Sequence, residues 1–255
     1  VLMRRNFDYV LFDLGNTLMF YDAPWPGSLE EATGALTSQL VGDGVPIEPA
    51  GFHADFQARM TQYYTSREID CVEVTSLDVL NSFLAEKGVL DVPIRQLRNA
   101  LAAMYAVSQS YWHVEEDTIP MLAELQQAGY KMGLVTNASD SDDVQVLVDK
   151  AGIRGYMDVT AISADIGLRK PHPRIFETAL KVWNALPGQA IMVGDLLPAD
   201  ILGANEMGMV SVWITRRASK SANQPYLETV KPDMTITSLR ELPAALLNFR
   251  GDRVE

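Results

Sequence analysis

Five polar side chains in this sequence have the chemistry of a site that transfers phosphoryl groups. Three are carboxylates, one is an amine and one is a hydroxyl, and they lie far apart in the chain: Asp13, Thr136, Lys170, Asp195 and Asp200. A carboxylate can attack phosphorus to form an acyl phosphate, which water then hydrolyses. Because a carboxylate and a phosphate repel each other, positive charge must lie between them. The set therefore predicts a nucleophile, a cation site and a group of phosphate contacts.

The carboxylates are expected to divide the work of attack and metal binding. Asp13 ends an apolar run directly before a polar turn, so we expect it to be the nucleophile. Mg²⁺ takes oxygen ligands in an octahedral shell and keeps several waters. Asp13 and Asp195 are its expected ligands, with the carbonyl oxygen of Gly15 as a third candidate. Asp200 would orient Asp195 or the waters of the ion, which completes the predicted metal site.

The remaining polar residues are expected to hold the phosphate. Lys170 would neutralise charge on Asp13 and on the transferring oxygens, and Thr136 would donate a hydrogen bond to one of them. Asn137 follows Thr136 and is a further candidate contact. A hydroxyl or a carboxylate also suits the first turn of a helix, so a purely structural role stays open for Thr136 and Asp200.

The elements that must position these residues follow from the hydrophobic pattern. Apolar runs at 7–14, 131–136 and 190–195 all carry their polar residues at the same end. They alternate with helical patterns from about residue 114 onward, with further strands predicted near 159–162, 210–214 and 234–237. Parallel strands place their carboxyl ends at one edge, where α/β folds bind ligands. The sequence therefore predicts an α/β fold with a Rossmann-like parallel sheet.

Residues 28 to about 110 show only helical signals. Ser28 and Glu31 match a capping box, Thr75 can cap a later helix, and Pro93 can open the next one with Ile94 on its inward face. Another helix is expected to begin near Glu48 or Pro49. We therefore expect an all-helical cap domain over residues 19–113, inserted into a core domain formed by residues 1–18 and 114–255.

Composition narrows the class of protein. The formal net charge is −12 and the pI is about 4.7, which argues against nucleic acid or an anionic membrane as a partner. One cysteine allows no intramolecular disulfide, and no apolar segment approaches a membrane span. The first residues lead directly into a core strand, which argues against a cleavable signal peptide. We expect a cytoplasmic protein, a monomer or a homodimer, that acts on a small phosphorylated metabolite.

Four segments in order give the chain a family resemblance. The segments are Phe12-Asp13-Leu14-Gly15-Asn16-Thr17-Leu18, Val135-Thr136-Asn137, Arg169-Lys170-Pro171-His172-Pro173-Arg174-Ile175-Phe176, and Val193-Gly194-Asp195 through Asp200. Together they resemble the nucleophile, Ser/Thr, lysine and metal segments of the haloacid dehalogenase superfamily, in particular its phosphatase-like members with a helical cap. The resemblance implies a Mg²⁺-dependent phosphatase that works through an aspartyl-phosphate on Asp13.

The chain departs from that family pattern at one position. The family's phosphatases usually carry a second Asp two residues after the nucleophile, as general acid and base, and this chain has Gly15 there. A general acid or base contributes about 10²–10⁴ in rate, so a cap residue or a water held by the metal would have to relay the proton. The family's dehalogenases also lack that Asp, which keeps attack on a carbon–halogen bond open, although they need no metal and Asp195 matches a metal ligand. A catalytically weak binding or regulatory protein is the third interpretation.

Overall fold

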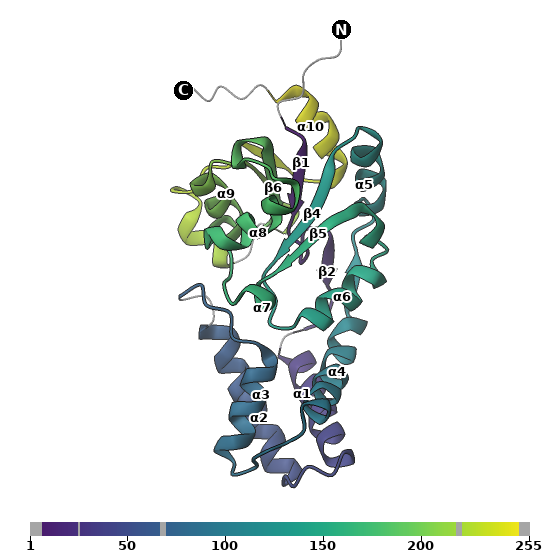
Figure 1. Ribbon diagram of the computed structural model, residues 1–255, viewed down its shortest axis with the longest axis vertical. Helices are drawn as coiled ribbons and strands as arrows, with labels where there is room; N and C mark the ends of the chain where they lie inside the picture. The colour runs from purple at the N-terminus through teal and green to yellow at the C-terminus, as the bar shows by residue number, and fades with distance from the viewer. Residues whose placement is uncertain (1–6, 25, 67–69, 218–220, 250–255) are drawn as a thin grey trace.

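A parallel sheet of six strands forms the centre of the core (Figure 1). The computed structural model describes residues 7–24, 26–66, 70–217 and 221–249. The prediction that the chain has no signal peptide concerns the first six residues, which lie outside the described part. All neighbouring strands pair in parallel. In sheet order the strands are β5 (Met157–Ile162), β4 (Lys131–Thr136), β1 (Tyr9–Phe12), β6 (Ala190–Gly194), β7 (Val210–Ile214) and β8 (Met234–Ile236). The predicted α/β sheet is confirmed.

Helices cover both faces of this sheet because its strands are apolar on both sides. Val10 and Phe12 pack into one hydrophobic cluster, and Leu11 between them packs into another, as the two-residue period of a strand requires. The first cluster includes α5 (Thr118–Gln127), α6 (Ser141–Lys150) and α10 (Leu242–Asn248); the second includes α8 (Pro173–Trp183) and α9 (Leu202–Met207). Short helices complete the core: α7 (Ser163–Ile166), η1 (Arg154–Tyr156), η2 (Pro187–Gln189), η3 (Leu197–Ile201), η4 (Ser221–Tyr226) and η5 (Leu239–Glu241).

Four helices lie together beyond the end of the sheet and form the cap (Figure 1). They are α1 (Gly27–Gly42), α2 (Pro49–Ser66), α3 (Ser76–Glu86) and α4 (Ile94–Ser110), and they enclose a hydrophobic cluster of their own. Two short strands, β2 (Met19–Tyr21) and β3 (Trp112–Val114), pair antiparallel where the chain enters and leaves the cap. The division at residues 18/19 and 113/114 remains a prediction. No described helix is long and apolar enough to cross a bilayer.

Local signals for the cap helices had mixed outcomes. The cap at Thr75 is confirmed, because its Oγ1 accepts the amide of Asp78. The capping box at Ser28 is wrong, since α1 begins at Gly27 with Pro26 as its N-cap, and Ser28 is buried within the helix. The inward face predicted for Ile94 is also wrong: this first residue of α4 is 65% exposed, because the helix packs through Leu97 and the residues that follow it.

Candidate active site

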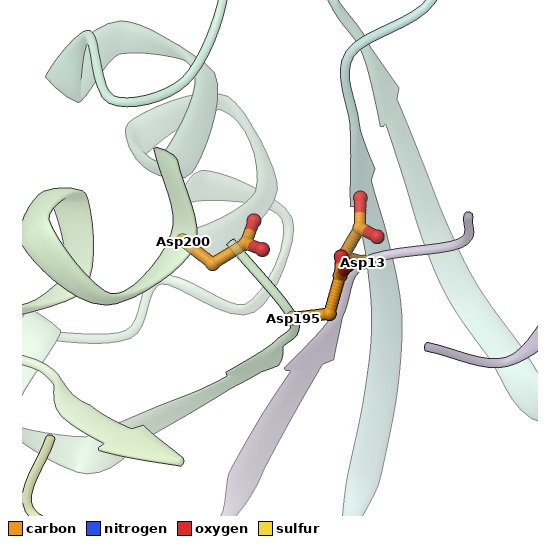
Figure 2. Close-up of side chains that lie close together, drawn as sticks. All are labelled: Asp13, Asp195 and Asp200. Carbon is orange, nitrogen blue, oxygen red and sulfur yellow. The ribbon is translucent and has the colours of Figure 1, made fainter. Parts of the chain in front are cut away.

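Three adjacent strands deliver polar residues to one edge of the sheet. Asp13 directly follows β1, Asp195 directly follows β6, and Thr136 is the last residue of β4. The amide of Asp13 continues the strand pairing by donating to the Val193 carbonyl at 3.0 Å. Asp200 lies in η3, which follows β6, and its carboxylate approaches the other two (Figure 2). One carboxylate oxygen from each of Asp13, Asp195 and Asp200 lies within 4.8 Å of the other two, so these residues form one buried carboxylate cluster.

Lys170 lies inside this cluster. Its Nζ is 2.7 Å from Asp13 Oδ1 and 2.7 Å from Asp200 Oδ1, and it donates to the Val135 carbonyl at 2.7 Å. Burial opposes the charge of the amine, but the negative charges of Asp13 and Asp200 outweigh this and raise the pKa of Lys170. Lys170 is therefore a permanent cation in contact with the expected nucleophile.

The side chain of Asn137 fixes the backbone on which Lys170 sits. Its Oδ1 accepts the Lys170 amide at 2.7 Å, and its Nδ2 donates to the Lys170 carbonyl at 3.1 Å. Both ends of the amide side chain therefore hold the lysine loop against β4. The substrate contact predicted for Asn137 stays a prediction, while its positioning of Lys170 is a role that the sequence did not indicate.

Asp200 is held in place by the turn after β6. Its Oδ2 accepts the Leu196 amide at 2.9 Å. A β-carbon at Gly194 would lie 2.3 Å from Asp200 Cγ, so only glycine leaves room for this carboxylate. Burial raises the pKa of Asp200, the charge of Lys170 opposes this, and the like charge of Asp13 adds to the rise. The glycine that precedes Asp195 thus has a direct steric cause.

Thr17 is a contact of Asp13 that sequence reasoning missed. Its Oγ1 lies 3.3 Å from Asp13 Oδ2 and is buried. The turn that follows β1 returns Thr17 toward Asp13, and its position four residues after Asp13 was the available signal. Lys170 and Thr17 therefore contact different oxygens of the same carboxylate and restrict its rotation.

The carboxylate cluster opens into a cavity of about 530 Å³ between core and cap. Asp13, Thr136 and Gly15 line it from the core, and Trp112 lines it from the strand that leaves the cap. A β-carbon at Gly15 would lie 3.1 Å from Trp112 Cη2, closer than the usual separation of non-bonded carbons. The indole therefore lies against the position where the resemblance leads us to expect a second Asp.

A buried polar network joins the cap to the core beside the loop that carries Lys170. Arg169 Nη1 lies 2.5 Å from Glu73 Oε2, which also accepts from Ser163 Oγ at 2.5 Å. The other oxygen of Glu73 accepts from the Tyr63 hydroxyl at 2.8 Å. Arg169 and Glu73 have side chains only 3% and 0% exposed, and Arg169 directly precedes Lys170. The cap is therefore anchored to the core one residue from Lys170.

The carboxylate cluster suits a hard divalent cation. Carboxylate oxygens are the ligands that such ions prefer, and Asp13, Asp195 and Asp200 supply them within a small buried volume. One ammonium among three carboxylates leaves an excess of negative charge that a divalent ion would balance. The residues present therefore fit a metal ion, while the carbonyl of Gly15 stays a predicted ligand.

A parallel α/β core with a carboxylate cluster at its carboxyl edge, covered by a helical insertion, defines a class of capped α/β hydrolases. A family model described as "Hydrolase: haloacid dehalogenase-like hydrolase" matches residues 7–208. The chain belongs to this haloacid dehalogenase-like hydrolase family.

Similar proteins of this family include several named phosphatases. The chain is 36% identical over 143 residues to glyceraldehyde 3-phosphate phosphatase of Methanopyrus kandleri. The matched region covers 56% of this chain and 60% of that protein. It is 28% identical over 244 residues to ribulose-1,5-bisphosphate 5-phosphatase of Halopiger xanaduensis, covering 91% and 96%. The structure of a phosphatase from Thermococcus onnurineus matches with a TM-score of 0.63 and 27% identity, covering 96% and 100%. The chain thus spans less than two thirds of the first of these relatives.

Proposed function

We propose that the protein is a Mg²⁺-dependent phosphatase that hydrolyses a small phosphorylated metabolite through an aspartyl-phosphate on Asp13. One observation carries this proposal: Lys170 joins Asp13 to Asp200 inside a cluster whose carboxylate oxygens also include those of Asp195. This arrangement combines a nucleophile with the positive charge it needs to approach a phosphate.

The first step forms the acyl phosphate. A carboxylate oxygen of Asp13 attacks phosphorus, and the bond between phosphorus and the ester oxygen breaks. Lys170 and Thr17 hold the two oxygens of Asp13, so the carboxylate meets the phosphate in a fixed orientation. Thr136 lines the same cavity and would donate to a phosphoryl oxygen. The leaving alkoxide takes a proton from a donor other than Gly15, which has no side chain to supply one.

The second step regenerates the enzyme. A water attacks the phosphorus of the acyl phosphate, inorganic phosphate leaves, and the Asp13 carboxylate is restored. Lys170 stabilises the negative charge that gathers near Asp13 in both steps. The helical cap, anchored through Glu73 and Arg169, would exclude bulk water from the cavity.

A divalent cation held by Asp13, Asp195 and Asp200 would neutralise phosphate charge during attack. Ion binding can be measured without turnover, because a ligand that binds only the folded state raises the temperature of unfolding. We expect Mg²⁺ to raise that temperature in a concentration-dependent way, and Asp195→Asn to weaken this response.

The decisive experiment is a screen of phosphate monoesters with Mg²⁺ and with a chelator, using the native protein and Asp13→Asn. We expect phosphate release that needs the metal and falls by about 10⁴-fold or more in the variant. Asp8→Asn makes the same chemical change on the exposed residue that precedes β1, and should keep full activity. Equal phosphate release by the native protein and Asp13→Asn would refute the proposal.

Attack on a carbon–halogen bond is the second candidate, and Gly15 with the indole beside it favours it. Asp13 would then displace halide and form an ester that water hydrolyses. Halide release from a 2-haloacid in the presence of chelator, without phosphate release, would support this function. Silence in both screens, with ligand or partner binding intact, would support a binding or regulatory protein.

A further inference from the structure

The part of the cavity away from the carboxylate cluster is lined by aromatic residues. Tyr64 and Tyr105 contribute from the cap helices, and Tyr21 and Trp112 from the two strands that connect cap and core. The hydroxyl of Tyr105 is already engaged, since it lies 2.5 Å from Ser76 Oγ. The alcohol part of an ester whose phosphate lies at Asp13 would meet ring surfaces here, which favour apolar or aromatic groups.

Trp112 brings this aromatic wall close to the reacting centre. Its Cη2 lies 3.1 Å from the position that a β-carbon at Gly15 would take, two residues after the nucleophile. The ring of Tyr21 packs against that of Trp112, with centroids 5.3 Å apart. A leaving group that passes Gly15 would therefore contact the indole.

Both basic side chains among the described residues that line the cavity are already paired. Lys170 lies between Asp13 and Asp200, and Arg169 pairs with Glu73. A second phosphate or a carboxylate on the substrate would have to enter a partly buried space without a counter-charge, which is costly. The lining thus selects against a second anionic group.

Asp143 is the acidic residue that lines the cavity outside the carboxylate cluster, among the residues that the structure describes. It lies in the first turn of α6, and its Oδ1 accepts from Gln109 Nε2 of the cap at 2.9 Å. Burial raises the pKa of Asp143 to about 7, so near neutral pH it exists both as a carboxylate and as an acid. As a carboxylate it attracts an amine and repels an anion; as an acid it can donate to a hydroxyl or carbonyl.

We propose that this site selects monophosphate esters whose alcohol has apolar or aromatic surface and is uncharged or cationic, with Asp143 as the residue that rejects a second anionic group. This inference rests on the proposed phosphatase function and narrows its substrate class. It predicts that this site disfavours bisphosphates, the substrate class named for the Halopiger xanaduensis relative.

The test uses three aryl esters that differ only in one remote group: phenyl phosphate, 4-(aminomethyl)phenyl phosphate and 4-carboxyphenyl phosphate. We expect kcat/KM for the carboxyl ester to be at least about tenfold below that of the other two, since an unpaired like charge costs more than about 1.4 kcal/mol. Asp143→Asn should reduce this ratio severalfold. Asp142→Asn makes the same change on the neighbouring residue, whose side chain is 80% exposed, and should leave the ratio unchanged.

Acetyl phosphate, a mixed anhydride whose leaving group is only acetate, separates the two levels of the proposal. Turnover of acetyl phosphate together with equal rates for all three aryl esters would overturn the substrate class and leave the phosphatase function standing. No Asp13-dependent turnover of any ester would overturn both. If Asp143→Asn folds and keeps the same ratio of kcat/KM values among the three esters as the native protein, the role of Asp143 is overturned. If that variant unfolds, the ratios measured for the native protein still test the substrate class.

Discussion

The core and the cap use their buried polar residues in different ways. In the core, Lys170 contacts both Asp13 and Asp200 directly, and each of the three is fixed by backbone groups or neighbouring side chains. The cap presents aromatic rings to the cavity, and its buried carboxylate Glu73 is turned toward the core as an anchor. The difference suggests that the core supplies the chemistry and the cap selects what reaches it. Substitutions on each side of the cavity can test this division.

The largest effect is expected from Lys170→Met, which removes the cation from the core cluster. It leaves Asp13 and Asp200 buried without their shared partner, so phosphate would meet uncompensated negative charge. We expect kcat/KM to fall by about 10³-fold for every aryl ester and for acetyl phosphate. Steady-state kinetics across the ester panel measure this loss. A loss confined to bulky esters would contradict the division, because it would place Lys170 in selection.

The core was predictable because each of its segments combines local and global signals. β4 and β7 have the predicted ends, since each is a mostly apolar run that polar residues follow at its carboxyl end. Asp13, Asp195 and Thr136 come together because parallel strands share a carboxyl edge. Thr17 and the amide of Asn137 were harder to assign, since their contacts depend on how tight turns return toward the strand ends.

The junction between core and cap was not predictable, because its contacts join residues that are distant in sequence. Glu73 and Arg169 are 96 residues apart, and neither has a local signal that indicates a buried pair. The contact of Trp112 with Gly15 depends on the antiparallel pairing of β2 and β3, strands of three residues that the sequence pattern did not reveal. Periodicity predicted the cap helices and their general length, but not how they meet the sheet.

The next largest effect is expected from Glu73→Gln at this junction. The change leaves Arg169 buried without its counter-charge, which costs about 3 kcal/mol of unfolding free energy. Denaturant unfolding followed by circular dichroism measures this loss. Glu86→Gln is the matched control within the cap, because Glu86 pairs with Arg59 at the surface and should cost less than about 1 kcal/mol. Similar costs for both variants would show that the buried pair does not anchor the cap.

A smaller effect is expected from the pH dependence of stability at Asp143. Burial raises the pKa of this carboxyl to about 7, and its ordinary value in an unfolded chain is about 3.9. The folded state therefore holds the proton more tightly, so the contribution to stability is complete below pH 4 and is lost as pH rises from 4 to 7. The groups around Asp143 include Gln109, Asp140 and the hydroxyl of Tyr105, and Arg98 lies beside Asp140.

Asp143→Asn should remove this pH dependence. The free energy of unfolding of the variant, taken relative to that of the native protein, should be about 2 kcal/mol higher at pH 8 than at pH 4. This is roughly half of what the full pKa shift implies, because the side chain faces the cavity. Unfolding free energies at the two pH values measure the difference, with Asp142→Asn as control. The same difference in both variants would show that Asp143 is not the group that titrates.

The smallest effect is expected from Thr75→Ala, which tests whether the cap can lose stability without changing the chemistry. Thr75 Oγ1 accepts the Asp78 amide at 3.1 Å at the start of α3, and loss of such a cap costs about 1 kcal/mol. Thr75→Ser keeps the hydroxyl and should cost a few tenths of that. We expect urea unfolding to report the difference, while kcat/KM for acetyl phosphate stays within about twofold of the native value. A large fall in that rate would mean that cap and chemistry are coupled through the helix itself, because the small acetate group of acetyl phosphate makes little contact with the aromatic residues of the cavity.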